Sequence, residues 1–475
     1  MDDLDAWGRL SAEHQGITQQ LARFIAGLRV DALPSRTREI LRLALVDAIG
    51  CGLYGLQTPA GRILAQFAAE QGGPEETGLW GHGKRVSVLN AVLLAGTAVH
   101  GFDFDDHSRA KIHPGAIVVP VVLAMGERQK ASADLLLAAM AAGYETMNRV
   151  SQAANPSRAR MRGWHLTGTA GTFAAAAAAS VILGLDAPAT ASALGLAGTQ
   201  SAGLWAFTAD EGMSKRLHPG RSAQAGIAAA LLAQSGFIGP RYILEAKDGA
   251  FLFAMSDKPR PEQILHQLGE RWHTEETCFK PYACCGSNHA CVDATLSIVT
   301  ENGLHPDDVE QVIAGIPSVV MTQTGFDYRA DSVLNAQMSL RYNIAVALVD
   351  RQAYLEQFSA ERIADPLLLS IAQKMRLEVD AELDDLYPAV YGGRVTIVTR
   401  QGKTFSRRVD YSKGMPENPM SADDITGKFM SLATTVAGGQ AAREILDLAL
   451  RLFDGGDVAA LNQRLAWAGE MITVE

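Results

Sequence analysis

The chain has 475 residues, of which 48% are hydrophobic and 20% are charged, a composition typical of globular proteins. Because this length exceeds what one compact core usually supports, we expect two domains. The formal net charge of −10 at pH 7 and the lack of a long basic run argue against a nucleic-acid-binding surface.

The beginning of the chain and its cysteine content indicate a reducing compartment. Met1, Asp2 and Asp3 make an acidic start, and the first apolar run is short, so no secretory signal is predicted. We therefore expect a cytoplasmic protein whose five cysteines are thiols.

Start signals for helices recur in the first part of the chain. The Pro-Ser pair at 34–35 precedes a segment with apolar residues at helical spacing. The Thr-Pro pair at 58–59 opens another helix, in which Ile63, Leu64 and Phe67 form the predicted apolar stripe. Both segments are therefore predicted to be amphipathic helices.

Nearly continuous apolar segments follow, and they indicate buried helices. The segment 86–99 is almost entirely apolar, 118–125 is similar, and Ser132 stands where it can cap the next helix. Alanine dominates 170–185 and 190–198, and such small side chains let helices approach closely. The first of these two stretches is too short to span a membrane, so we predict a tight helical core and no membrane segment.

The C-terminal part of the chain has a different composition, in which strand patterns appear. Residues 309–316 are predicted to form a strand, and 394–409 a hairpin with its turn at 401–402. A helix is predicted over 338–349, and the chain returns to helix after Ser421.

These patterns predict a fold that is mostly α with an α+β part. A large all-helical domain is formed by both chain ends, residues 1–278 and 415–475. A smaller inserted α+β lid domain occupies residues 279–414.

The most unusual segment is 101–115, which places several titratable side chains in a short stretch between apolar helices. They are Asp103, Asp105, Asp106, His107 and His113. Groups this close perturb one another's protonation, and folding gains nothing from that arrangement. Our interpretation of the segment is therefore proton-transfer chemistry.

Three further segments combine charged residues with glycine or proline inside apolar sequence. Residues 160–168 carry basic groups just before a predicted helix N-terminus, which is a natural site for anions. In residues 212–221, Lys215 and His218 are three apart and share one side of a helical turn. Residues 279–289 lie at the predicted domain junction. Arginine and lysine bind carboxylates, so the four segments together favour a di- or tricarboxylate substrate.

Other interpretations of these segments stay open. A divalent metal ion is one alternative, with the ligand set Asp105, Asp106, His107 and His113. The cysteines lack the paired spacing of zinc or iron–sulfur sites, and no nucleotide-binding or nucleophile-elbow motif is present. A metal-dependent hydrolase and a non-catalytic binding protein on the same fold are therefore the remaining classes.

The four segments, in this order and spacing, resemble the MmgE/PrpD family, whose members include 2-methylcitrate dehydratase, cis-aconitate decarboxylase and iminodisuccinate epimerase. The resemblance extends over nearly the whole chain and includes the run 220–240 and the turn 413–419. It implies a large helical domain with a smaller α+β lid. It also implies a homodimer without cofactor or metal, with the site in a cleft between the domains.

The same resemblance assigns site positions to residues of this chain. The catalytic positions would be Asp103, His113, His165, Lys215 and His218. Lys280 and Tyr328 would be substrate-binding positions on the same ground. To these we add Arg162, as a basic group that can bind a carboxylate, and His107 and Cys285, which fall in or near the expected pocket. In the expected reaction, Asp103 or His165 removes the proton α to a carboxylate and His113 acts as the opposing acid.

The chain departs from the family pattern at two positions of the expected site. His107 stands where the family commonly has threonine, and Cys285 stands where the decarboxylase has histidine. The second change argues against cis-aconitate decarboxylation. We therefore expect a cofactor-independent lyase or isomerase acting on a small polycarboxylate. A 2-methylcitrate dehydratase-like hydro-lyase is the first choice, and an epimerase or racemase of an imino- or amino-dicarboxylate is the second.

Overall fold

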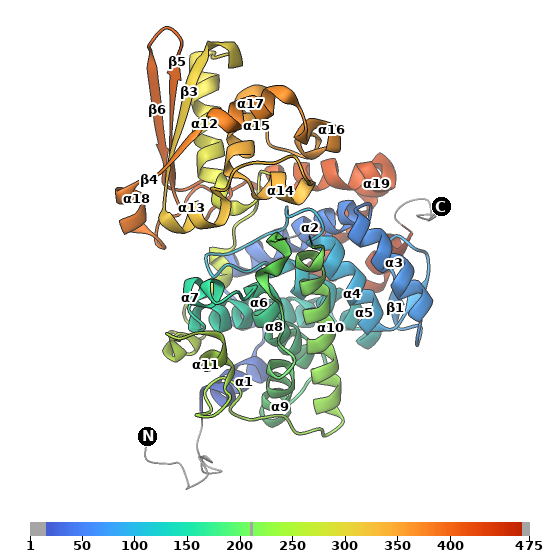
Figure 1. Cartoon of the computed structure of the whole chain (residues 1–475). Coiled ribbons are helices and arrows are strands. Elements are labelled where there is room, and N and C mark those ends of the chain that lie inside the picture. The colour runs from blue at the N-terminus through green and yellow to red at the C-terminus, as the bar shows by residue number, and fades with distance from the viewer. Residues whose placement is uncertain (1–15, 210–211, 468–475) are drawn as a thin grey trace. The chain divides into compact units, whose positions relative to one another are not determined.

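The computed structural model of the chain describes residues 16–209 and 212–467 (Figure 1). The acidic start of the chain, and the outer ends of the predicted helical domain at 1–15 and 468–475, lie outside the described residues. None of the described helices is both long and apolar enough to cross a membrane.

The described residues form two compact units. The first unit consists of residues 16–207, 212–277 and 422–467. The second unit consists of residues 208–209 and 278–421. The first is helical apart from one short hairpin and the second combines helices with a sheet, which confirms the prediction of a mostly α fold with an α+β part.

The first unit contains most of the helices. They are α1 (Ile17–Gly27), α2 (Ser35–Gly55), α3 (Pro59–Gln71), α4 (Val88–Val99), α5 (Gly115–Gln129), α6 (Ala133–Ala153), α7 (Pro156–Met161), α8 (Leu166–Ile182), α9 (Ala187–Gly198), α10 (Ser214–Gln234), α11 (Phe251–Met255), α19 (Ala422–Arg451) and α20 (Val458–Ala466). A short antiparallel hairpin pairs β1 (Thr77–Gly78) with β2 (Arg85–Val86).

The helix start signals in the sequence are confirmed. Helix α2 begins at Ser35, directly after proline. The Thr58 hydroxyl accepts a hydrogen bond from the Gly61 amide at the start of α3, at 3.1 Å. The Ser132 hydroxyl accepts one from the Leu135 amide at the start of α6, at 3.3 Å. Each side chain satisfies a backbone donor that the helix itself leaves without a partner.

Helix α8 lies at the centre of the first unit. All of its residues are buried, and it packs against α5, α6, α9 and α10. The approach of α10 is close, because a Cβ atom built on Gly226 would lie 2.6 Å from the Thr172 carbonyl oxygen and 2.4 Å from the Ala175 Cβ. The tight packing predicted from the alanine-rich sequence is therefore present.

The apolar stripe predicted for α3 is wrong. The buried residues of this helix are Ala60, Gly61, Ala65 and Ala68. Ile63 and Phe67 are instead 56% and 45% exposed. Helix α3 packs against α4 through this small-residue face, and a Cβ atom on Gly61 would lie 2.2 Å from the Gly55 carbonyl oxygen at the end of α2, so bulky side chains would not fit there.

The second unit contains one mixed sheet and seven helices within the described residues. The strands are β3 (Val309–Ile316), β4 (Arg376–Val379), β5 (Gly393–Thr399) and β6 (Thr404–Val409). The helices are α12 (His289–Asn302), α13 (Ser318–Thr324), α14 (Val333–Met338), α15 (Leu340–Asp350), α16 (Ala360–Ile363), α17 (Pro366–Lys374) and α18 (Ala381–Leu386). The strand order is β4-β3-β5-β6, with β3 parallel to β4 and the other pairs antiparallel.

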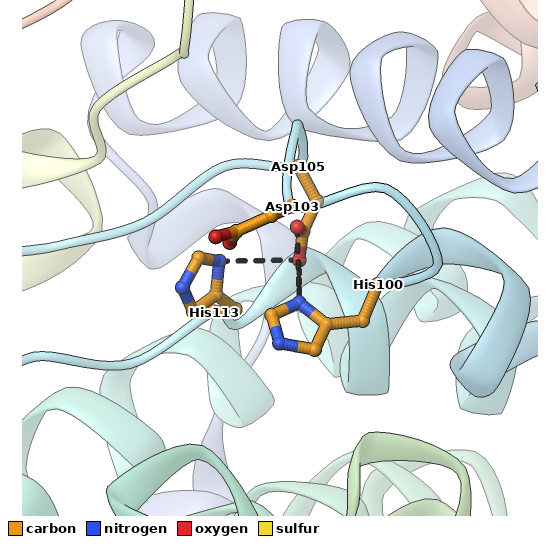
Figure 2. Close-up of side chains that lie close together, drawn as sticks. All are labelled: His100, Asp103, Asp105 and His113. Atoms are coloured by element: carbon orange, nitrogen blue, oxygen red, sulfur yellow. Dashed lines mark hydrogen bonds and ion pairs between the residues drawn. The ribbon is translucent and has the colours of Figure 1, made fainter. Parts of the chain in front are cut away.

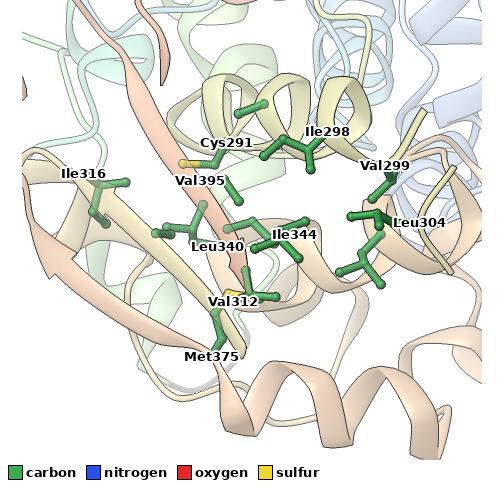
Figure 3. Packing of buried hydrophobic residues seen from close by; sticks show 14 of the residues in the cluster. Cys291, Ile298, Val299, Leu304, Val312, Ile316, Leu340, Ile344, Met375 and Val395 are labelled. Atoms are coloured by element: carbon green, nitrogen blue, oxygen red, sulfur yellow. The ribbon is translucent and has the colours of Figure 1, made fainter. Parts of the chain in front are cut away.

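The core of the second unit lies between its sheet and the helices α12 and α15 (Figure 3). Burial alternates along β5, with Val395 and Ile397 in the core. They face Ile298 of α12 and Ile344 of α15 in the same cluster. This alternation is the pattern that predicted the hairpin, and the strand over 309–316 is confirmed as well.

Candidate active site

A cluster of acids and imidazoles lies in the first unit, where the chain passes from α4 to α5. His100 caps the C-terminus of α4, and an irregular segment connects it to α5. Asp103 in this segment has a left-handed backbone with φ +56°, which aspartate tolerates better than most residues. Asp103, Asp105 and Asp106 are each no more than 1% exposed. Their contacts with neighbouring groups therefore decide what the segment can do.

Asp105 is shared by two imidazole rings (Figure 2). Nδ1 of His100 lies 3.0 Å from both carboxylate oxygens of Asp105, and Nδ1 of His113 lies 3.2 Å from Oδ2. Burial alone would raise the pKa of the Asp105 carboxyl, but His100 and His113 outweigh it and hold that pKa well below its usual range. An ionised carboxylate only accepts hydrogen bonds, so the His100 ring presents its Nδ1–H to Asp105. The His113 Nδ1 lies close to the same carboxylate but forms no hydrogen bond with it in this structure.

Asp103 forms a buried ion pair with Lys215 of α10. The Lys215 Nζ lies 2.8 Å from Asp103 Oδ2, and the two side chains are 5% and 1% exposed. The next residue, Arg216, donates from Nη1 to the His100 carbonyl oxygen at 3.2 Å. The first turn of α10 therefore holds the segment after α4 by one ion pair and by one hydrogen bond to a backbone carbonyl oxygen.

A second pair of imidazoles lies next to the first. Nδ1 of His165, at the N-cap of α8, lies 2.8 Å from Nδ1 of His218 on α10. The rings of Trp205 and Phe207 lie edge-on to His165, with ring centroids at 5.4 and 5.6 Å. The His100 ring is stacked on His165 at 6.0 Å between centroids. His100 thus links the two imidazole pairs.

Three of these rings are neutral near pH 7. Burial lowers the pKa of His100 to about 3. Burial, with a contribution from His218, holds the pKa of His165 well below its usual range. Burial and the nearby Lys215 lower the pKa of His218 to about 4. A neutral imidazole can accept a proton, so these rings are in the form that a general base requires.

Asp106 has a different environment from Asp103 and Asp105. Its carboxylate accepts hydrogen bonds from the Gly115 amide and the Tyr144 hydroxyl, each at 2.8 Å. Burial and the neighbouring acids Asp47 and Asp105 raise the pKa of Asp106 well above its usual range. These contacts join the segment to α5 and α6, and they indicate a structural role for Asp106.

Lys428 of α19 holds the same segment from the C-terminal part of the chain. Its Nζ lies 2.7 Å from Asp47 Oδ1 on α2 and 2.6 Å from the Phe104 carbonyl oxygen. The Lys428 ammonium also lies 4.0 Å from the centroid of the Phe104 ring. Because Phe104 separates Asp103 from Asp105, this lysine helps to position both acids.

Four side chains of the cluster offer metal-binding atoms close together. They are His100, Asp103, Asp105 and His113, whose ligand atoms lie within 4.8 Å of one another. Asp106 and His107, which belong to the metal hypothesis drawn from the sequence, are not in this set. Lys215 already supplies a positive charge to Asp103, and Asp105 is hydrogen-bonded to His100 and lies 3.2 Å from the His113 Nδ1. The contacts fit a hydrogen-bonded acid–base array better than a ligand set.

The structure brings most predicted residues of the first unit together. The catalytic candidates form one array through the contacts given above: Asp103, His113, His165, Lys215 and His218. The half-buried His107 ring lies 6.2 Å from the His113 ring between centroids. Arg162 is exposed at the C-terminal end of α7, and its neighbour Arg160 stacks on Trp205 at 3.7 Å. Arg162 therefore lies outside the array.

The other predicted substrate-binding residues belong to the second unit. Lys280 is 1% exposed, and Cys285 is half-buried at the start of a short 3-10 turn. The Tyr328 hydroxyl donates to the Ile363 carbonyl oxygen at 2.7 Å, and its ring packs 4.9 Å from Tyr342. The Tyr328 side chain thus packs and hydrogen-bonds within the second unit. Substrate binding by these residues stays a prediction.

Sequence reasoning missed His100 and Lys428. His100 directly follows an apolar helix and directly precedes the acidic segment, and this position was the only available signal. Lys428 lies in a helix far along the chain and carries no local signal, because its partners Asp47 and Phe104 come from the first quarter of the sequence.

The array can perform acid–base chemistry on an anion. It offers two imidazole pairs for proton transfer and a lysine ammonium that can bind a substrate carboxylate in competition with Asp103. The surrounding side chains are buried, so electrostatic contacts there are stronger than in water.

Comparison with known protein families agrees with this chemistry. The MmgE/PrpD N-terminal domain matches residues 19–263, and the MmgE/PrpD C-terminal domain matches residues 282–452. The two matches together cover most of the chain.

Curated relatives match along nearly their whole length. The chain is 29% identical over 475 residues to a cis-aconitate decarboxylase of Aspergillus terreus, covering 95% of this chain and 96% of the relative. It is 28% identical over 476 residues to the cis-aconitate decarboxylase-like protein oryM of Aspergillus oryzae, covering 95% and 97%. It is 27% identical over 462 residues to the cis-aconitate decarboxylase of Homo sapiens, covering 95% and 95%.

Proposed function

Because the chain belongs to the MmgE/PrpD family and is a lyase, we propose that it cleaves a small tricarboxylate by moving a proton at the carbon beside a carboxylate. The observation that carries this proposal is the buried array of imidazoles beside the ion pair of Asp103 and Lys215. Lysine binds one carboxylate of the substrate, and the imidazoles exchange protons with its carbon atoms.

The proposed roles follow from the contacts of each group. His165 is the first proton-transfer group, because its ring is neutral and its Nδ1 is held by His218. His113 is the second, held from its Nδ1 side by Asp105. Lys215 binds a substrate carboxylate and stabilises the negative charge that develops on it during the reaction. Each positioned acid or base is worth roughly 10²- to 10⁴-fold in rate.

Decarboxylation of a cis-aconitate-like substrate is the reaction that the relatives favour. In this reaction the bond between carbon and one carboxylate breaks, CO₂ leaves, and the electron pair left behind takes up one proton, which an imidazole passes on from solvent. One proton is therefore consumed for each CO₂ released. The names of the curated relatives at 27–29% identity are the specific support for this bond cleavage.

Dehydration of a hydroxytricarboxylate such as 2-methylcitrate is the second candidate. Here one imidazole removes the proton α to a carboxylate, and a second group protonates the leaving hydroxyl, so that water and an alkene form with no net proton change. Two separate imidazole pairs suit a reaction that needs a base and an acid at once. The departures from the family pattern at His107 and Cys285 also favour a substrate other than that of the decarboxylases.

The proposal is tested by incubating the protein with cis-aconitate, citrate and 2-methylcitrate in deuterated buffer and recording proton NMR spectra. CO₂ release with one deuterium on carbon in the product supports decarboxylation, and an alkene formed from a hydroxy acid supports dehydration. Hydrogen exchange without bond cleavage, or no change with any substrate, would overturn the proposal. The assay is repeated with EDTA, and turnover is expected to persist because the proposed chemistry uses no metal.

The same substitution at an exposed histidine provides a matched control for His165. We expect His165→Asn to lose roughly 10²- to 10⁴-fold in turnover. The exposed His266→Asn should keep the wild-type rate, because the His266 side chain is in solvent. Equal rates for the two variants would remove His165 from the mechanism.

A further inference from the structure

We propose that Asp105 is a positioning residue that holds His113 with its Nδ1–H toward the protein, so that Nε2 is the atom that exchanges the proton with the substrate. This inference rests on the proposed function, in which His113 is one of the two proton-transfer groups. It gives a positioning role to Asp105, which the sequence placed in the acidic segment without a catalytic assignment, and it gives His113 a defined tautomer.

The geometry around Asp105 carries the inference. Its carboxylate is fully buried, and the rings of His100 and His113 approach it from two sides (Figure 2). The His113 Nδ1 lies 3.2 Å from Asp105 Oδ2, while the His113 side chain keeps 14% of its surface exposed. In Figure 2 the second nitrogen of His113 points away from Asp105. One nitrogen of this ring therefore faces a buried acceptor and the other does not.

The tautomer follows from the nature of the acceptor. A neutral imidazole carries a hydrogen on one nitrogen and a lone pair on the other. An ionised carboxylate 3.2 Å from Nδ1 can only accept, so it favours the tautomer with the hydrogen on Nδ1 and the lone pair on Nε2. When Nε2 takes a proton, Asp105 also stabilises the positive charge that forms on the ring.

His100 also restrains Asp105, next to His113. Its ring is fully buried, and its Nδ1 lies 3.0 Å from both oxygens of Asp105. Its backbone is held in turn, because Arg216 donates to the His100 carbonyl oxygen. The Nε2 of His100 is buried and finds no hydrogen-bond partner among the described residues. His100 is thus a buried support for Asp105.

The neighbouring Asp106 offers a matched comparison. It is also fully buried, but its carboxylate accepts hydrogen bonds from the Gly115 amide and the Tyr144 hydroxyl and from no imidazole in the described contacts. Two adjacent aspartates of equal burial therefore differ in whether they contact a catalytic ring.

The experiment measures the tautomer of His113 directly. In protein labelled with ¹⁵N-histidine, two-bond proton–nitrogen correlation spectra distinguish the nitrogen that carries hydrogen, and comparison with His113→Asn assigns the ring. We expect the Nδ1–H form in the wild type and in Asp106→Asn, and a mixed or Nε2–H form in Asp105→Asn. A wild-type His113 with its hydrogen on Nε2 would overturn the proposal, even if Asp105→Asn fails to fold.

Kinetics give a second readout. Asp105→Asn should lower kcat by roughly 10²- to 10⁴-fold with KM changed only a few-fold, because the substrate still binds to Lys215 while proton transfer is impaired. His100→Asn keeps an N–H donor for Asp105 and should lose less than Asp105→Asn does. Unchanged kcat in Asp105→Asn would overturn the proposal. If no tricarboxylate reacts at all, the proposed function fails, whereas the tautomer measurement still decides the role of Asp105.

Discussion

Lys215, the proposed substrate-binding lysine, also stabilises the fold, because it forms a buried ion pair with Asp103. Lys215→Met keeps most of the side-chain length but removes the ammonium group from a carboxylate that is 1% exposed. We expect the free energy of unfolding to fall by about 3 kcal/mol, since Asp103 then keeps a buried charge that lacks this cation. Urea denaturation followed by circular dichroism measures the change.

The double variant Asp103→Asn with Lys215→Met is the control for this prediction. It removes both charges, so it should recover most of the stability that the single variant loses. Wild-type stability in the single Lys215→Met variant would show that the pair contributes little.

The imidazole pair of His165 and His218 makes stability depend on pH. Histidine in an unfolded chain has a pKa near 6.5, whereas burial and Lys215 lower the pKa of His218 to about 4. Between these values the unfolded chain binds a proton that the folded protein does not, so stability falls as the pH falls from 6.5 toward 4. Asp106, whose pKa is raised, has the opposite effect in this range.

His218→Asn separates the two effects, because Asp106 is present in both proteins. From pH 7 to pH 5, the wild type should lose more unfolding free energy than the variant, by on the order of 1 kcal/mol for this partly solvated ring. Urea titrations at the two pH values measure the difference, and His266→Asn should follow the wild type. Equal losses in wild type and His218→Asn would contradict the assignment.

At the scale of elements, the break within α19 depends on one glycine. Gly438 interrupts the helix with φ +76° and ψ 160°, a backbone region that is essentially restricted to glycine. Gly438→Ala should therefore lower the free energy of unfolding by about 1–3 kcal/mol. Thermal and urea unfolding measure the loss.

Gly427 in the same helix is the matched control. No atom lies within 4 Å of where its Cβ would be, and its backbone is not in the left-handed region. Gly427→Ala should raise stability by roughly 0.5–1 kcal/mol, because alanine favours the helix. If both variants changed stability in the same direction, the break at Gly438 would not depend on glycine.

At the scale of the whole molecule, the first unit is assembled from separated parts of the chain. Helix α19 returns to the first unit after residues 278–421 and packs against α2. Lys428 of α19 adds polar contacts to this packing, since its ammonium group contacts Asp47 and the Phe104 carbonyl oxygen in the acidic segment. The C-terminal helices therefore support the candidate site directly.

Lys428→Met tests this long-range support. We expect a loss of about 3 kcal/mol in unfolding free energy, because Asp47 is fully buried and loses the cation beside it. Turnover should fall as well, since the backbone between Asp103 and Asp105 is no longer held. Steady-state kinetics and urea unfolding provide the two readouts, and the exposed Lys84→Met serves as control. Wild-type kinetics in Lys428→Met would limit its role to stability.

The sequence by itself determined the family, the mostly α fold with an α+β part, and the position of several helices and strands. These follow from local signals: the Ser132 cap, the alternation along 394–409 and the alanine-rich stretch at 170–185. Such signals act within a few residues, so they can be interpreted without knowing the rest of the molecule. The acidic segment was recognisable for the same reason.

Only the tertiary structure decided which groups meet. His165 and His218 are 53 residues apart, and Lys428 and Asp47 are 381 residues apart, so no local spacing predicts either contact. The exposed face of α3 was mispredicted because close helix packing selected its small residues rather than its large ones. The pairing of His100 with Asp105 likewise depends on how buried helices pack around an irregular segment.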